Sequence, residues 1–140
     1  MTDLVADAPP LVRTITFTLP FCLPSLNVRD RQHWSERHRQ TVALNQEVMV
    51  AIGGPRHYPR PPFDRARVTV LRISAGELDP DNLVASLKSL LDVLKLRTER
   101  NPLGLSFIRG DEPGRCELVA KQQRGARKEG ATVVRIEELR

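Results

Sequence analysis

The most regular pattern in the sequence lies at residues 81–97, where apolar side chains recur at helical spacing. The residues in this pattern are Leu83, Val84, Leu87, Leu90, Leu91 and Leu94. Pro80 suits the first turn of a helix, and Pro102 and Gly104 lie beyond its expected end. The pattern therefore predicts one helix over residues 81–97, with one face buried.

Four other segments have the alternation or the β-branched content typical of strands: residues 11–19, 66–73, 115–122 and 132–137. A further helix is expected from about Asp30, a suitable N-cap, to about Ile52, before two glycines. The predicted order is β-α-β-α-β-β, an α/β or α+β domain whose mixed sheet is packed by two helices. A basic turn at residues 123–130 joins the last two strands.

Length and composition indicate a single small globular domain. The chain has 140 residues, of which 40% are hydrophobic, so we expect a loose tail at residues 1–10 and one domain at residues 11–140. No apolar run is long enough to span a membrane, and the acidic N-terminus does not resemble a secretory signal. These features predict a cytoplasmic protein. Cys22 and Cys116 lack metal-site spacing and are expected to be packed residues.

Charge is unevenly distributed along the chain, which carries a formal net charge of +5. Basic residues gather at residues 29–40 and 121–128, and acidic residues gather between them at residues 77–112. A metal-dependent nuclease needs this combination, because cations hold the phosphate backbone while carboxylates hold the metal. The alternative is an ordinary solvated surface.

The acidic residues with the most informative spacing are Asp79 and Asp81, on either side of Pro80 where the second strand gives way to the helix. Two carboxylates so placed can converge on one hard cation, and Mg²⁺ suits such a site. On a regular helix Asp81, Lys88 and Asp92 share a polar stripe opposite the leucine face. The alternative is a solvated helix face with a Lys88–Asp92 ion pair.

Several motifs, taken in order, resemble the RusA-type Holliday junction resolvases, which are crossover-junction endodeoxyribonucleases of phages and prophages. Residues 23–27 read Leu-Pro-Ser-Leu-Asn, similar to the family's Pro-Ser-x-Asn element. Residues 79–83 read Asp-Pro-Asp-Asn-Leu, similar to its Asp-x-Asp-Asn core. Residues 92–94 are similar to its later Asp-x-Leu motif, and residues 111–112 are similar to its second acidic doublet. Residues 122–125 and 133–136 resemble the closing hairpin of phage members.

The resemblance implies a homodimer that binds Mg²⁺ or Mn²⁺ and resolves four-way branched DNA by paired symmetric incisions, in DNA recombination and repair. Carried over to this chain, it implies that Asp79, Asp81 and Asp111 are catalytic metal ligands. It also implies a catalytic lysine, which the family usually places four residues after the second aspartate. That position is Ala85 here, so the role passes to Lys88 one turn further on.

A second departure is the long segment, residues 98–110, that separates the helix from the Asp111–Glu112 doublet. Asp111 has an alternative interpretation as a turn residue beside Gly110. Asn82, Asp92 and Glu112 are assigned supporting roles. Asp92 lies about 16 Å from Asp81 along a regular helix axis, too far to share a metal.

Contacts with DNA are assigned to Asn27 and to the basic residues on both flanks. The basic residues are Arg29, Arg31, Arg37, Arg39, Lys121, Arg124, Arg127 and Lys128. Trp34, between these arginines, either packs half-buried in the core or at an interface, or stacks on an unpaired base, and packing is the favoured interpretation.

Two rival functions stay open. One is a non-catalytic, basic DNA-binding module that has lost the metal site. The other is a nuclease of a class that pairs an acid and a lysine on one strand, here Glu117 and Lys121.

Overall fold

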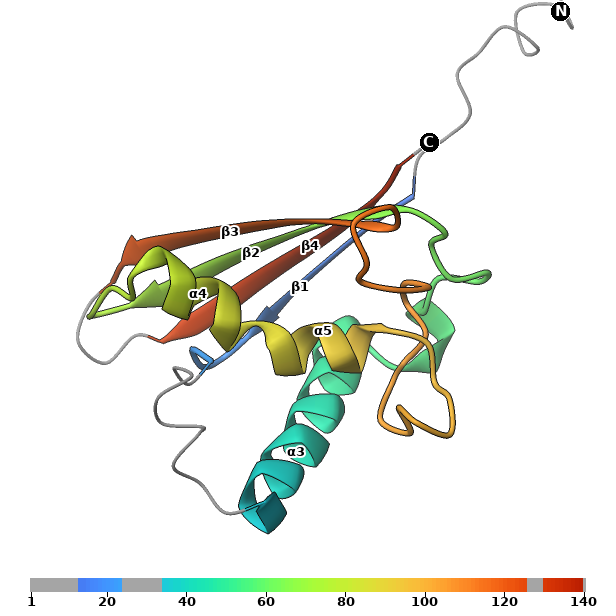
Figure 1. Ribbon diagram of the computed structural model, residues 1–140, viewed down its shortest axis with the longest axis horizontal. Coiled ribbons are helices and arrows are strands. Elements are labelled where there is room, and N and C mark those ends of the chain that lie inside the picture. Colours follow the sequence, from blue (N-terminus) through green and yellow to red (C-terminus); the bar gives the residue numbers. More distant parts are fainter. Residues whose placement is uncertain (1–12, 24–33, 126–129, 140) are drawn as a thin grey trace, which may run out of the picture.

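A mixed four-stranded sheet with helices on one face forms this small α+β domain, as the computed structural model shows (Figure 1). The structure describes residues 13–23, 34–125 and 130–139. Its elements are β1 (Thr14–Leu19), α3 (Trp34–Ile52), a 3-10 helix (Pro55–His57), β2 (Ala66–Ser74), α4 (Pro80–Ser86), α5 (Lys88–Leu94), β3 (Cys116–Arg124) and β4 (Ala131–Glu138). The four predicted strands are confirmed. The predicted start of the first helix, near Asp30, lies outside the described residues, and its end at Ile52 is confirmed.

The strands lie in the order β1-β4-β2-β3. β2 and β3 are parallel, and β4 runs antiparallel to both β1 and β2. The expected closing hairpin of the last two strands is therefore wrong, because β2 lies between them. Burial explains the order: β4 buries Thr132, Val134 and Ile136 and takes a central position, whereas β3 has no fully buried residue and forms an edge.

The helix predicted at residues 81–97 is two short helices that meet at Leu87. In a regular helix the carbonyl of Leu83 would accept the N–H of Leu87. Here the buried Ser86 hydroxyl donates to that carbonyl (2.7 Å), and the Leu87 N–H bonds the carbonyl of Val84 instead. Serine hydroxyls that bond the preceding turn bend helices, so this side chain accounts for the break.

α5, the second of these two short helices, ends before the predicted end at Arg97, because the segment that follows it folds back onto its last turn. The Leu105 N–H donates to the carbonyl of Val93, and the N–H groups of Phe107 and Ile108 donate to that of Leu94. These bonds satisfy carbonyls that the helix end leaves free. Phe107 and Ile108 are thereby fully buried, and α5 stops at Leu94.

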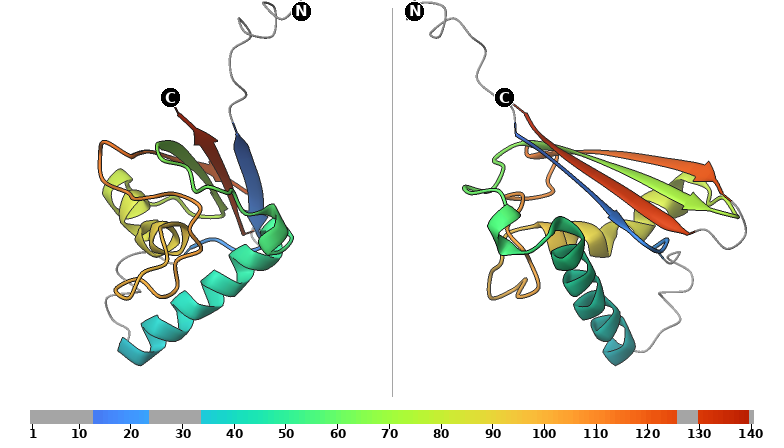
Figure 2. Two further views of the ribbon diagram at one scale, coloured as in Figure 1. Left: turned by 90° about the vertical axis from the view of Figure 1, so that its right-hand side faces the viewer. Right: turned by 180° about the vertical axis from the view of Figure 1, so that it is seen from behind.

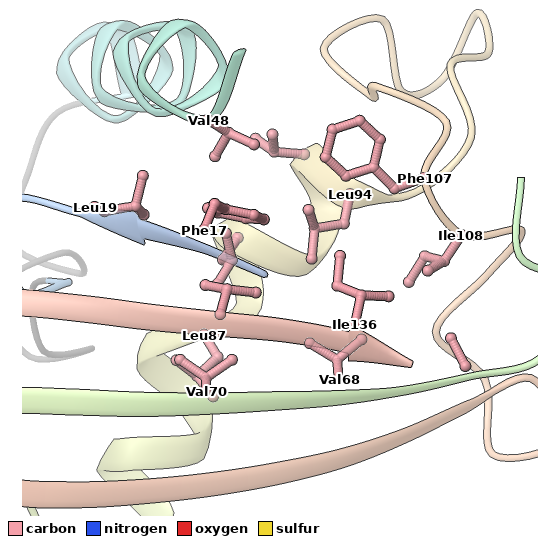
Figure 3. Close-up of a cluster of buried hydrophobic side chains, with 14 of the residues drawn as sticks. Phe17, Leu19, Val48, Val68, Val70, Leu87, Leu94, Phe107, Ile108 and Ile136 are labelled. Carbon is pink, nitrogen blue, oxygen red and sulfur yellow. The ribbon is translucent and has the colours of Figure 1, made fainter. Parts of the chain in front are cut away.

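The core lies between the sheet and the helices, and Figure 3 shows part of it. Val68 and Val70 of β2 and Ile136 of β4 meet Leu87 and Leu94 there. Among the described elements, α3, α4 and α5 cover the same face of the sheet (Figure 2). Within the described ranges, no helix combines the length and the apolar composition that crossing a membrane requires.

Candidate functional site

The predicted acidic motif lies where β2 passes into α4, at the end of the sheet that holds the carboxyl ends of β2 and β3. These two ends lie together because β2 and β3 are parallel, and Ser74 of β2 is paired with Arg124 of β3. Asp79 is the N-cap of α4. Its Oδ1 accepts the backbone N–H of Asn82 (2.9 Å) and its Oδ2 accepts the Asn82 side-chain amide (2.7 Å). Asn82 therefore fixes the orientation of the Asp79 carboxylate.

Asp81 follows in the first turn of α4 and is exposed. Pro80 between the two aspartates occupies the first helical position, which its fixed φ suits. A carboxylate in this first turn also faces the positive end of the helix dipole. Local chemistry thus holds two exposed carboxylates at the same strand-to-helix junction.

Two side chains that the sequence analysis did not assign to the site tie this junction to the sheet. Gln122 of β3 accepts the N–H of Leu78 (3.0 Å) and donates to its carbonyl (2.6 Å). Arg72 of β2 is buried and donates to the carbonyl of Gly76 (3.1 Å). Its Nε has no hydrogen-bond partner among the described residues. The sequence does carry a signal for this role, because Arg72 is a charged residue at an inward position of the alternating strand 66–73.

Two basic side chains lie near the carboxyl end of β3. Lys121 and Arg124 are exposed. Alternation along the strand puts Arg124 on the same side as Gln122, towards the Asp79 junction, and Lys121 on the opposite face of the sheet. Arg124 is therefore the described cation best placed to meet a phosphate bound at Asp79 and Asp81.

A second charged cluster lies at the far end of α5. The ammonium group of Lys95 is 3.0 Å from Asp92 Oδ1 and 3.5 Å from Asp111 Oδ2. Burial lowers the pKa of Lys95, but the hydrogen bond and charge of Asp92, together with Asp111, outweigh it and raise the pKa overall. The Lys88–Asp92 ion pair, which the sequence offered as an alternative, is not the pair that forms, because Asp92 pairs with Lys95.

An open hollow of about 420 Å³ adjoins this cluster and is lined by Arg100, Arg109 and Glu112 as well as the three paired residues. Glu112 itself pairs with Arg115 (2.9 Å). A more apolar hollow of about 310 Å³, between α3 and the helix break, is lined by none of the predicted site residues.

The two clusters are separated by α4 and α5, as Figure 1 shows for the elements that carry them. Asp79 and Asp81 begin α4, whereas Asp111 contacts Lys95 just after α5. Across residues 13–23, 34–125 and 130–139, no three His, Cys, Asp or Glu side chains are grouped as a metal site. Lys88 is the exposed first residue of α5, beyond the break from Asp81.

Among the residues assigned to DNA, Arg37 and Arg39 lie on α3, while Asn27, Arg29, Arg31, Arg127 and Lys128 lie outside the described residues. Trp34 is 68% exposed and stacks on His38, so the interpretation of Trp34 as a half-buried core residue is wrong. Glu117, of the alternative acid–lysine pair, forms an ion pair with Arg67 (3.3 Å). Cys116 and Cys22 are both free and partly buried.

Comparison with known proteins gives no assignment: no protein-family model matches the chain, and no curated protein matches it significantly.

Proposed function

We propose that this protein is a RusA-type endonuclease that uses Mg²⁺ or Mn²⁺ to resolve Holliday junctions during DNA recombination and repair. The observation that supports it best is the pair of exposed carboxylates, Asp79 and Asp81, at a strand-to-helix junction beside Arg124. The proposal places the protein in the cytoplasm of a host that carries the phage or prophage.

The donor chemistry of the junction fits Mg²⁺. Asp79 and Asp81 offer only carboxylate oxygens, and Mg²⁺ takes one or two carboxylates and keeps several waters. Each Asp79 oxygen accepts one hydrogen bond from Asn82, and a carboxylate oxygen has a second lone pair to give. Asp111, the third ligand that the resemblance implies, contacts Lys95 at the other end of the α4–α5 unit, so in this arrangement Asp79 and Asp81 would be the protein ligands of the cation.

The chain's own residues have distinct parts in this mechanism. Asn82 holds Asp79 in one orientation, and Arg124 attracts the phosphate backbone at the junction, whereas Lys121 attracts DNA from the opposite face of the sheet. Lys88 stabilises negative charge that develops at the scissile phosphate. Asp79 and Asp81 would hold Mg²⁺ or Mn²⁺, which would supply Lewis acidity at the junction and make an attacking water more acidic.

Paired incision favours a homodimer. A four-way junction has twofold symmetry, and a cyclic dimer presents two equivalent sites to it.

A second function, a non-catalytic DNA-binding module, is favoured by one specific observation. Asp111 forms an ion pair with Lys95 and lies at the other end of the α4–α5 unit from Asp81. In this alternative the basic surface is retained, and the Asp111 carboxylate serves only to hold the segment between α5 and β3 against Lys95.

The deciding experiment measures cleavage of a synthetic four-way junction, a fork and a linear duplex by the wild type and by Asp81→Asn. We expect cleavage of the junction that requires Mg²⁺ or Mn²⁺, and its loss in Asp81→Asn with DNA affinity unchanged or slightly higher. Affinity survives because the substitution removes a ligand and one negative charge near phosphate. Glu99→Gln is the matched control, because Glu99 is an exposed acid in the loop after α5.

Full cleavage by a folded Asp81→Asn variant would contradict the metal assignment. Junction binding by the wild type without cleavage in either metal would instead support the non-catalytic module.

A further inference from the structure

An exposed aromatic pair begins the described part of α3. The rings of Trp34 and His38 are stacked, with centroids 5.6 Å apart and planes within 7° of parallel. Trp34 is 68% exposed. The two residues are four apart, so the helix brings them to the same face, and His38 fixes the orientation of the indole.

This half of α3 extends away from the rest of the molecule. Figures 1 and 2 show the N-terminal half of the helix projecting beyond the sheet and the other helices. The buried residues of α3 are Leu44 and Val48, both beyond the first ten residues of the helix. The core therefore does not explain the position of the indole, which is presented to solvent at the end of a projecting helix.

The chemistry around the indole suits a nucleobase. Arg37 lies three residues after Trp34 and is its neighbour on the helix surface. Proteins that bind single-stranded nucleic acid combine such cations, which follow the phosphates, with aromatic rings on which bases stack. Bases inside a duplex are already stacked, so only an unpaired base can offer its face to Trp34.

The same surface does not resemble a docking site for another protein. The other large exposed apolar side chains of the described residues are Val50, 16 positions further along α3, and Val84 on α4. The residues that follow Trp34 in the helix are all polar or charged: Ser35, Glu36, Arg37, His38, Arg39 and Gln40. An energetically important tryptophan in a protein interface lies in a well-packed pocket, and interface cores are depleted in charged residues.

We propose that Trp34, supported by His38, stacks on an unpaired base of the DNA substrate while Arg37 pairs with an adjacent phosphate. The inference rests on the proposed function in taking DNA as the partner. It goes beyond that function by assigning a contact that selects branched or single-stranded DNA over perfect duplex, at a surface distinct from the Asp79 junction.

The single tryptophan of this chain allows a direct test. Intrinsic fluorescence is titrated with an oligothymidylate, a four-way junction and a blunt linear duplex. We expect strong quenching by the oligothymidylate and the junction, and weak quenching by the duplex. Binding of labelled DNA is then compared for Trp34→Ala, Trp34→Phe and Val50→Ala.

Loss of one base–aromatic stack predicts about 5- to 150-fold weaker binding of oligothymidylate and junction by Trp34→Ala. Duplex affinity should stay within about twofold, because the phosphate contacts that hold duplex DNA remain. Trp34→Phe keeps a ring and should retain most of the affinity. Val50→Ala removes an exposed apolar side chain from the same helix and should have no effect.

Wild-type affinity in Trp34→Ala would overturn the inference and leave the proposed function intact if junctions are still cleaved. Equal quenching by all three DNAs would overturn the selection for unpaired bases. A changed oligomeric state in Trp34→Ala with unchanged DNA affinity would identify a protein contact instead. Failure of the wild type to bind any of the three DNAs would overturn both proposals.

Discussion

Lys95 has an unusual position for a lysine, because it is partly buried between two carboxylates from different segments. It joins Asp92 of α5 to Asp111 of the segment that precedes β3. Exposed ion pairs contribute little to stability, but removal of one partner from a partly buried network leaves the remaining charges uncompensated, which costs more. The ion pairs therefore fasten the long segment between α5 and β3.

We predict that Lys95→Met lowers the free energy of unfolding by about 1 kcal/mol near neutral pH. The pKa of Lys95 is raised in the folded state, so its contribution is complete below the unfolded value of about 10.4. It is lost as pH rises through the folded pKa. Denaturant unfolding from about pH 7 to about pH 11 tests this, with the exposed Lys88→Met as control. A constant difference between wild type and Lys95→Met at all pH values would contradict an electrostatic role.

Cys116 shows how the acidic segment affects a neighbouring group. Burial and the charges of Asp111, Glu112 and Glu117 raise the pKa of its thiol to about 11. The thiolate is the reactive form, so the folded protein should protect this cysteine.

We predict that iodoacetamide modifies Cys116 at pH 8 at least about 100-fold more slowly in the folded protein than in the denatured chain, whose thiol pKa is about 8.5. Peptide mapping after timed alkylation measures each cysteine separately. Equal rates in the folded and denatured protein would show that the thiol is neither buried nor close to these carboxylates.

At the level of elements, the segment between α5 and β3 contains no helix or strand and yet is closely packed. Asn101 donates from its side-chain amide to the carbonyls of Asp92 and Leu96. A Cβ at Gly104 would lie 2.5 Å from the carbonyl oxygen of Lys95 and 2.6 Å from that of Leu96. Only glycine therefore lets this segment return close enough to cap α5.

We predict that Gly104→Ala lowers the free energy of unfolding by about 1–3 kcal/mol, the usual cost of overpacking. The matched control is Gly114→Ala, because a Cβ there meets nothing within 4 Å. Thermal and denaturant unfolding of both variants measures the difference. Equal stability of the two variants would mean that the segment can move away from α5 without cost.

The elements that the sequence predicts correctly depend on local patterns. Alternation at residues 66–73 is enough to identify β2, because its inward positions are apolar apart from Arg72. The break at Leu87 depends on the direction of one hydroxyl, Ser86, which no periodicity reveals. The position of β4 between β1 and β2 depends on pairings between residues distant in sequence, and hydrophobic patterns do not specify a neighbour.

The candidate site likewise has one part that local sequence signals predict and one part that they do not. A strand, a proline and a capping aspartate are local signals, so the junction of Asp79 and Asp81 follows from the sequence. The contact of Asp111 with Lys95 requires the path of residues 96–110, which has no helical or strand pattern. Sequence spacing alone therefore misassigned the partner of Asp92.

At the scale of the whole molecule, the net charge of +5 is distributed over separate surfaces. Arg37 and Arg39 lie on the projecting half of α3, whereas Lys121 and Arg124 lie at the carboxyl end of β3, and Figure 1 shows these two elements apart. Other arginines are already paired, such as Arg67 with Glu117. Only part of the positive charge is therefore free to meet phosphate.

We predict that DNA affinity falls steeply between about 50 mM and about 200 mM salt, because each phosphate contact releases counterions. Removing one contact reduces the slope of log affinity against log salt by about 0.9. The double variant Arg37→Ala with Arg39→Ala and the double variant Lys121→Ala with Arg124→Ala should therefore each reduce it by about 1.8. Because the two surfaces are separate, the quadruple variant should show the sum of both effects. Arg67→Ala, which removes a paired arginine, should leave the slope unchanged, and an equal loss in Arg67→Ala would mean that net charge alone governs binding.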